Sequence, residues 1–151
     1  MLRRLTVVVA VLACAVGAFS GSSAATTSVD LVYDSGPKFP SARDMVGPRI
    51  GWVISKQLFN GSLEVNVEVR RADANATYFV TIYCGPTHAT AGNVIDSGDT
   101  VTTNASGAAS YSTTIPLAQL TAACGPGSHT GHIDLDSTTT TLAATPLEFT
   151  S

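Results

Sequence analysis

The chain has 151 residues, 44% of them hydrophobic, and its 11 acidic residues outnumber its 8 lysines and arginines, which gives a net charge of −3. Phosphate binding requires a concentrated positive surface, and after residue 25 the only adjacent basic residues are Arg70 and Arg71. The composition therefore makes nucleic acid a poor partner for this protein.

The first 25 residues have the pattern of an export signal. Two arginines precede an uncharged apolar run from Leu5 to Phe19, and Ser23-Ala-Ala25 supplies the small residues that signal peptidase requires. The run is short for a membrane span of about 20 residues. We expect a secreted protein with no membrane span in the mature chain, and one domain over residues 26–151.

Cys14 offers a second interpretation of the same segment. Val11-Leu-Ala-Cys14 resembles the lipobox of bacterial lipoproteins, in which the cysteine is lipidated and becomes the mature N-terminus. That resemblance implies a membrane-anchored protein instead of a freely secreted one.

Strand patterns begin directly after the predicted signal. Thr27–Tyr33 is a plausible first strand, and Ile50–Lys56 a second, with Ile50, Trp52 and Ile54 on one face. The prolines between these two segments forbid regular ladder pairing there.

The stretch Gly61–Cys84 carries the clearest signal. Its first arm alternates strictly, because Leu63, Val65, Val67 and Val69 are apolar and the residues between them are polar, which predicts a half-buried strand. Its second arm, Thr77–Cys84, is rich in aromatic and β-branched residues. The polar run 71–75 predicts a hairpin-type or inter-sheet connection between the two arms.

The remaining strands are short and are separated by turn residues. We expect a strand at Asn93–Ser97, a hairpin of Asp99–Thr103 with Ser110–Ile115 around Asn104-Ala-Ser-Gly107, and a helical turn within Pro116–Cys124. His129–Asp136 alternates, with Asp134 and Asp136 outward, and Leu142–Thr150 closes the domain. The pattern predicts an all-β fold, a single antiparallel β-sandwich of about seven strands.

Two cysteines follow the predicted signal, Cys84 and Cys124. An exported chain with two thiols most simply pairs them, which closes a loop of about 40 residues and stabilises the fold by about 4 kcal/mol in the chain-entropy model. A reactive free thiol or an intermolecular bridge are the alternatives.

The segment from Asn75 to Cys84 resembles the strand that carries the tyrosine corner of immunoglobulin and fibronectin type III domains. In those domains a tyrosine shortly after a connecting loop bonds back to the loop backbone, and Tyr78 has that position here. The signal and the Thr/Ser/Gly-rich turns resemble small exported proteins of actinobacteria. These resemblances imply an architecture and a compartment, and no activity.

The three histidines are the candidate metal ligands. His88 and His129 each follow a Cys-Gly-Pro turn, so a Cys84–Cys124 bond would bring their turns together, and His132 lies three residues beyond His129. Zinc or copper accepts three imidazoles, but exposed loop histidines fit the same pattern.

Phe79 and Tyr83 share one face of the predicted strand 77–84 and form a candidate binding face for a sugar or a protein. The competing interpretation is that the first strand or the segment 34–49 covers this face. The sequence contains no G-x-S-x-G elbow, phosphate loop or metalloprotease helix motif.

We expect a non-enzymatic binding domain without a cofactor, whose partner is a protein or glycan at the cell surface. The alternative is an exported protease inhibitor that presents Gly85–Gly92 or Cys124–Gly131 to a protease. A hydrolase or metal enzyme is the third class, since the aspartic-protease triplet Asp-Ser-Gly occurs at Asp34 and Asp96, although the chain is too short for the two-lobed enzyme.

Overall fold

The computed structural model describes residues 26–34, 48–85 and 93–151 and shows an all-β chain with one short helix. The predicted signal with Cys14, the histidine His88 and the loop 86–92 lie outside the described residues. The elements in chain order are β1 (Thr26–Asp34), β2 (Arg49–Gln57), β3 (Leu63–Val69), β4 (Thr77–Cys84), β5 (Val94–Thr102), β6 (Ala109–Ile115), α1 (Leu117–Cys124), β7 (Ser128–Asp136) and β8 (Thr141–Thr150).

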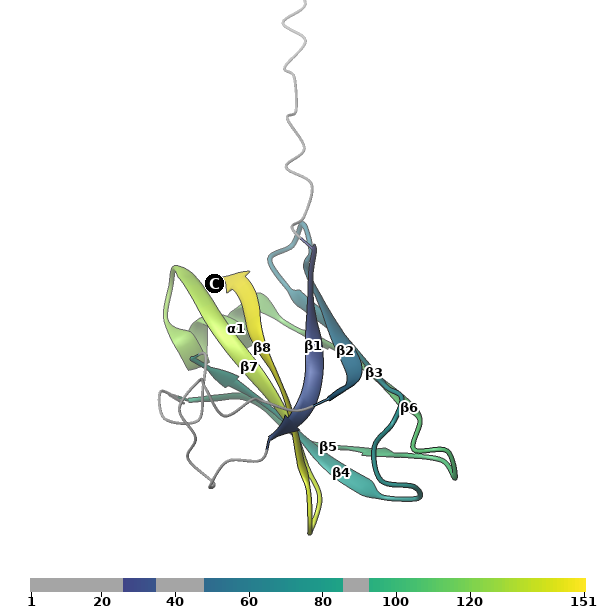
Figure 1. The fold of residues 1–151 in the computed structure, drawn as a ribbon. Coiled ribbons are helices and arrows are strands. Elements are labelled where there is room, and N and C mark those ends of the chain that lie inside the picture. The colour runs from purple at the N-terminus through teal and green to yellow at the C-terminus, as the bar shows by residue number, and fades with distance from the viewer. Residues whose placement is uncertain (1–25, 35–47, 86–92) are drawn as a thin grey trace, which may run out of the picture.

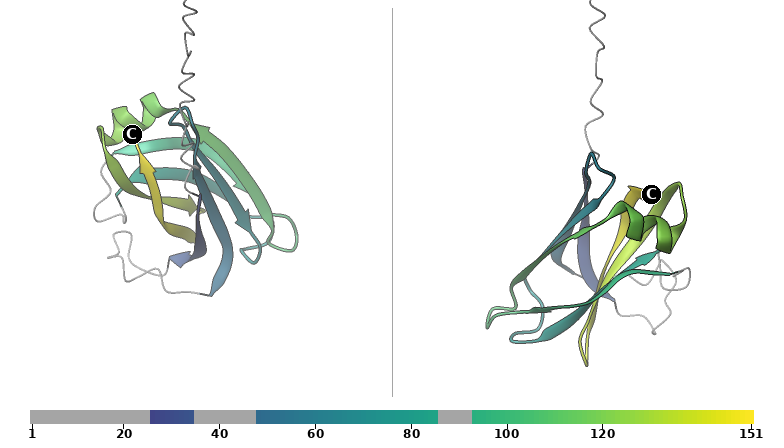
Figure 2. Two further views of the ribbon diagram at one scale, coloured as in Figure 1. Left: turned by 90° about the horizontal axis from the view of Figure 1, so that it is seen from above. Right: turned by 180° about the vertical axis from the view of Figure 1, so that it is seen from behind.

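The described strands form one antiparallel sheet of eight strands, in the order β5-β4-β7-β8-β1-β2-β3-β6. The sheet curls until its edges, β5 and β6, approach each other, so it is nearly closed into a barrel (Figures 1 and 2). The all-antiparallel β fold is confirmed. The predicted sandwich is not, because the eight described strands make a single continuous sheet, where we expected two sheets and about seven strands.

Strand β3 shows how the alternating pattern builds the core. Its four predicted inward residues, Leu63, Val65, Val67 and Val69, are at most 1% exposed, and the polar residues between them are half-buried on the outer side. β3 pairs with β2 and β6, whereas β4 pairs with β5 and β7. The connection 70–76 therefore joins strands that are not neighbours in the sheet, and a hairpin between β3 and β4 does not form.

Strand β2 contains a bulge that reverses one predicted face. Leu31 of β1 lies opposite Gly51, and the next residue lies opposite Arg49, so Ile50 is the extra residue. Ile50 is 2% exposed and its carbonyl accepts the N–H groups of Arg70 and Arg71, at 2.7 and 3.3 Å. Because of this bulge Ile50 faces inward while Trp52 and Ile54 face outward, which corrects their predicted common face.

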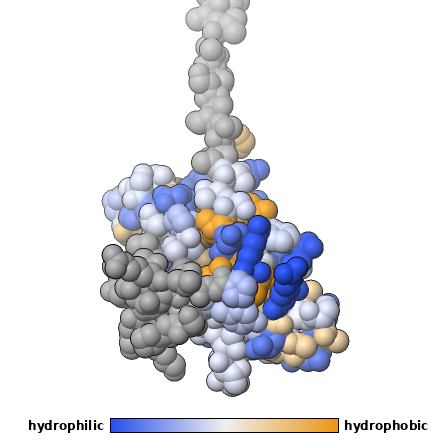
Figure 3. Space-filling view, viewed as in Figure 1, coloured by the Kyte–Doolittle hydropathy of each residue, from blue (hydrophilic) through white to orange (hydrophobic). Residues whose placement is uncertain are grey.

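The outer side of β1, β2 and β3 is mixed in character. Figure 3 shows strongly hydrophilic residues over these strands, with hydrophobic residues between them. The cross-strand partners that face outward there include Asp30, Trp52 and Glu68, which lie opposite one another on successive strands.

Tyr78 pins the connection between β3 and β4, as the tyrosine-corner resemblance implies. Its side chain is fully buried, and its Oη accepts the backbone N–H of Asp73 at 3.3 Å. Thr103 supports the same loop, since its hydroxyl donates to the carbonyl of Asp73 at 2.5 Å. Gly107 packs so closely that a Cβ would lie 2.1 Å from the carbonyl oxygen of Ala72, at a φ of 75° that glycine adopts readily.

Two elements in the middle of the chain differ from those predicted from the sequence. β5 is one strand that continues through Gly98, where we expected a break, and the turn at Asn104–Gly107 leads from β5 to β6 without a ladder between the described strands. The expected hairpin is therefore absent there, because these two strands are the opposite edges of the sheet. The expected helical turn is an eight-residue helix, α1, whose Leu120 is fully buried in the core.

The Gln57 side chain joins β2 to the end of β8. Its amide nitrogen donates to the carbonyl of Thr150 at 2.9 Å, and its amide oxygen accepts the Thr150 N–H at 2.8 Å. Thr26, at the start of β1, lies opposite Lys56, the residue before Gln57. The first and last strands thus meet at the same rim of the sheet.

Candidate functional site

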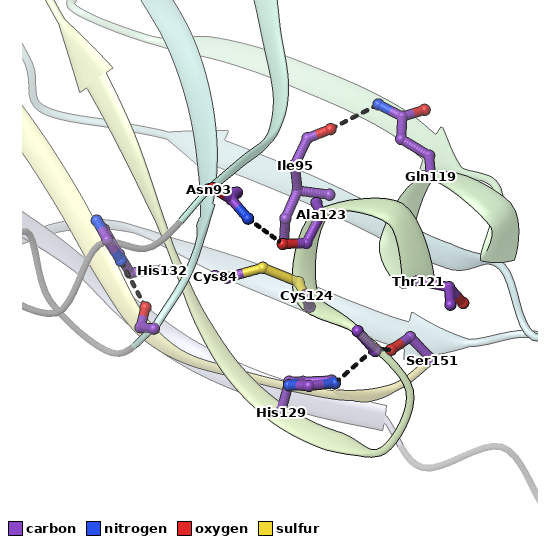
Figure 4. The surroundings of a disulfide bond; sticks show 12 residues. Cys84, Asn93, Ile95, Gln119, Thr121, Ala123, Cys124, His129, His132 and Ser151 are labelled. Carbon is purple, nitrogen blue, oxygen red and sulfur yellow. Dashed lines mark hydrogen bonds between the residues drawn. A yellow bond between two sulfur atoms is a disulfide. The ribbon is translucent and has the colours of Figure 1, made fainter.

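The predicted disulfide is confirmed. Cys84, the last residue of β4, is bonded to Cys124, the last residue of α1, with a Cα–Cα distance of 5.8 Å (Figure 4). Two hydrogen bonds hold the helix against the same edge of the sheet: Asn93 Nδ2 donates to the carbonyl of Ala123 at 2.8 Å, and Gln119 Nε2 donates to the carbonyl of Ile95 at 2.6 Å. The bond therefore fixes α1 over one end of the nearly closed barrel.

The two described histidines do not converge. They are three positions apart on β7, so they project from opposite faces of the strand. His129 contacts the carbonyl of Gly125 at 3.0 Å and lies beside Phe149, whereas the His132 ring is on the outward side and contacts the carbonyl of Gly85 at 2.6 Å (Figure 4). Within the described residues, no three potential metal ligands form a group.

His132 belongs to a buried polar cluster with Tyr83 and Asp134. The rings of Tyr83 and His132 stack with centroids 4.8 Å apart and an interplanar angle of 12°, and His132 Nε2 lies 3.5 Å from Asp134 Oδ2. His132 and Asp134 are fully buried, and burial, with a further contribution from the charge of Asp134, raises the pKa of Tyr83. Asp134 faces outward as predicted, but it is fully buried there and does not contact solvent.

The outer surface of β4 and β5 carries exposed apolar side chains. Phe79 is 59% exposed and Val94 is 47% exposed, while Tyr83 is half-buried against His132. Phe79 lies opposite Asp136 on β7 and Thr100 on β5. We call Phe79, Tyr83 and Val94 the β4–β5 face. The structure thus places the two predicted face residues on one side of β4 and adds Val94.

A second outward cluster escaped the sequence analysis. The guanidinium of Arg70 lies 4.6 Å from the ring centroid of Trp52, and that of Arg49 lies 5.5 Å from it. Arg49 Nε is also 2.9 Å from Asp30 Oδ1. We call Trp52, Arg49 and Arg70 the Trp52 stack. The Arg70–Arg71 pair was visible in the sequence, but the position of Arg70 beside Trp52 follows from the strand pairing, in which the bulged Ile50 accepts the Arg70 N–H at 2.7 Å.

The edges of the sheet are joined by side chains. Tyr111 Oη on β6 donates a hydrogen bond to Asp99 Oδ2 on β5 at 2.8 Å. Thr113 Oγ1 on β6 likewise donates to Asp96 Oδ2 on β5 at 3.4 Å. Burial, together with the neighbouring charge of Asp99, raises the pKa of Tyr111 to about 12. The carboxylates of both Asp96 and Asp99 therefore contribute to the closure of the sheet by accepting hydrogen bonds.

The pKa of Tyr111 predicts alkaline destabilisation. Since the folded protein holds the Tyr111 proton above the unfolded pKa of 10.0, deprotonation favours the unfolded chain, and the free energy of unfolding falls between about pH 10 and 12. Tyr111→Phe should make that decline shallower and should cost about 1 kcal/mol or less at neutral pH, through the lost hydrogen bond. Urea unfolding at a series of pH values measures both effects. Equal alkaline slopes for the variant and the wild type would contradict the prediction.

Comparison with protein-family models, with curated proteins and with solved structures finds no match for this chain. Among the described residues, no helix has the length and apolar character needed to cross a membrane.

Proposed function

We propose that the protein is a non-catalytic binding domain that acts outside the cell and contacts its partner through the β4–β5 face. The observation that carries the proposal is the exposure of Phe79, 59% of whose surface is open to solvent on a regular strand. Transfer of apolar surface out of water contributes about 25 cal/mol per Å², so a partner that covers Phe79 and Val94 gains a substantial part of its affinity there.

The surroundings of Phe79 suit a polar partner with apolar patches. Thr77 lies two residues before Phe79 on β4, its hydroxyl is 2.9 Å from that of Thr102 on β5, and Asp136 lies opposite Phe79 on β7. An aromatic ring bordered by hydroxyl and carboxylate groups is the chemistry that recognises sugar rings and also the centre of many protein interfaces. The predicted export supports a partner at the cell surface, either a glycan or a protein.

Matched phenylalanine variants test the proposal. Phe79→Ser removes the ring from the β4–β5 face, and Phe59→Ser removes a ring that is 90% exposed in the turn between β2 and β3. Immobilised wild-type protein should retain a cell-envelope glycan or a surface protein, the first variant should lose it, and the second should keep it. Both variants should melt like the wild type. Equal retention by the wild type and the Phe79 variant would remove the β4–β5 face as the site.

The alternative, a protease inhibitor, has one supporting observation. The described loop after Cys124 is held firmly, because Gly127 and Ser151 exchange backbone hydrogen bonds at 2.7 and 2.9 Å. However, Gly125 and Gly127 have φ angles of 78° and 130°, which turn the chain away from the extended conformation that a protease cleft binds. Stoichiometric inhibition in a panel of secreted proteases would support the inhibitor in place of the binding domain.

A further inference from the structure

The Trp52 stack contains one arginine, Arg70, that has no ion-pair partner among the described residues. Arg49 is paired with Asp30 at 2.9 Å, whereas no acidic side chain of the described residues forms an ion pair with Arg70. The Arg70 guanidinium instead lies over the indole ring of Trp52 at 4.6 Å. Stacking immobilises a guanidinium by one of its faces and leaves the N–H donors in its plane directed at solvent.

Such an arginine is suited to a planar oxyanion. A guanidinium binds a carboxylate through two parallel N–H···O bonds, and prior stacking lowers the entropy lost when those bonds form. Arg71 lies next in the chain, and its backbone is anchored by the bond to the Ile50 carbonyl. The guanidinium groups of Arg49 and Arg70 thus lie beside one indole ring in a protein whose net charge is negative.

A polar groove continues from the stack along the same row of residues. Trp52 lies opposite Glu68 on β3, and Glu68 lies opposite Ser110 on β6. The groove between β3 and β6 has a volume of about 240 Å³ and is lined by Asn66, Val67, Glu68, Ser110, Tyr111 and Ser112. Its hydroxyl, amide and carboxylate groups are of the kinds that hydrogen-bond the hydroxyl groups of a sugar ring.

We propose that the Trp52 stack and this groove form a binding site for an acidic saccharide, with the carboxylate of a uronic acid on Arg70 and a neighbouring sugar ring in the groove. The groove provides the argument for a saccharide over an acidic peptide, because most of the side chains that line it carry hydrogen-bonding groups. Glu68 accepts sugar hydroxyls and disfavours ligands with dense negative charge, so a single carboxylate fits better than a polyphosphate. Trp52 on β2 is separated from Phe79 on β4 by β7, β8 and β1 in one direction along the sheet, and β3, β6 and β5 lie between them in the other.

The chain supplies its own reporter, because Trp52 is the only tryptophan in the sequence. The probe is a short oligogalacturonate, compared with its methyl ester and with an oligoglutamate of equal charge, and binding is followed by tryptophan fluorescence and by calorimetry. Saturable binding of the acid is expected, together with much weaker binding of both other compounds. Equal binding of the ester would overturn the role of the carboxylate, and equal binding of the peptide would overturn the saccharide. Failure of the acid to bind by either method would overturn the site.

Three charge variants locate the site. Arg70→Gln should weaken oligogalacturonate binding by about tenfold or more, through loss of a charge-assisted bidentate contact. Arg70→Lys keeps the charge without the planar fork, so it should also bind more weakly than the wild type. Lys56→Gln is the matched control, because it removes one exposed positive charge from β2, the strand that carries Trp52. It should change the affinity for oligogalacturonate by about twofold at most.

The pattern of losses decides the outcome. If Arg70→Gln binds with wild-type affinity, Arg70 makes no contact with the ligand and the proposal is wrong. If Lys56→Gln loses as much affinity as Arg70→Gln, the binding reflects only general charge attraction, and the proposal is also wrong. Phe79→Ser should bind oligogalacturonate like the wild type, which keeps this result independent of the β4–β5 face. Each variant is checked by its melting curve, and Arg70 is exposed, so its substitution leaves the core unchanged.

Discussion

Val67→Asp is expected to unfold the domain. Val67 is 1% exposed in the middle of β3, between Val53 on β2 and Tyr111 on β6, and no cation faces it there. A buried unpaired carboxylate costs several kcal/mol, and a domain of this size is stabilised by only about 5–15 kcal/mol. Circular dichroism and thermal melting should show an unfolded chain, or a melting midpoint far below that of the wild type.

Two companion variants separate charge from position. Val67→Ala removes only packing and should cost about 2 kcal/mol while the fold persists. Ser28→Asp places the same carboxylate on the exposed outer side of β1 and should melt like the wild type, because that side is solvated. A Val67→Asp variant with wild-type melting behaviour would mean that the inward and outward faces of β3 are reversed.

Loss of the disulfide is expected to have the next largest effect. The bond between Cys84 and Cys124 spans a sequence separation of 40, and the chain-entropy model gives about 4 kcal/mol for a loop of that length. The double variant Cys84→Ser/Cys124→Ser should lower the urea midpoint accordingly. Native-state hydrogen exchange should also quicken first in α1, because only the bonds from Asn93 and Gln119 then tie the helix to β5.

Reduction provides an independent control for this prediction. Wild-type protein treated with dithiothreitol should reproduce the midpoint of the double variant, and the double variant should be insensitive to the reagent. An unchanged midpoint after complete reduction would show that the buried Leu120 and the two hydrogen bonds hold α1 without the bond.

Local features of the fold were predictable because they depend on short-range chemistry. The alternation in β3 identified its buried face, the two cysteines after the predicted export signal identified their bond, and Tyr78 identified a loop that a buried tyrosine holds in place. Each of these follows from residue spacing or from an inventory of side chains. None of them requires knowledge of which strands are neighbours.

The arrangement of strands was not predictable in the same way. Alternation gives the face of a strand but not its partners, so one curled sheet and two packed sheets produce similar patterns. Asp134 shows the same limit for burial: its outward position followed from the alternation, but its full burial depends on tertiary surroundings. The bulge at Ile50 turns that residue inward while Trp52 stays on the outer side, and alternation alone does not show that Arg49 and Arg70 lie beside Trp52.

The hydrogen bonds between Gln57 and Thr150 have a consequence for circular permutation of the chain. Because Thr26 lies opposite Lys56 and Thr150 is bonded to the next residue, Gln57, the start of β1 and the end of β8 are a few residues apart. A circularly permuted protein, with Ser151 joined to Thr26 by a short glycine-serine linker and new ends in the exposed turn at Asn104–Ser106, should retain the sheet. In that permutant the order of strands along the gene changes while every neighbour in the barrel stays the same.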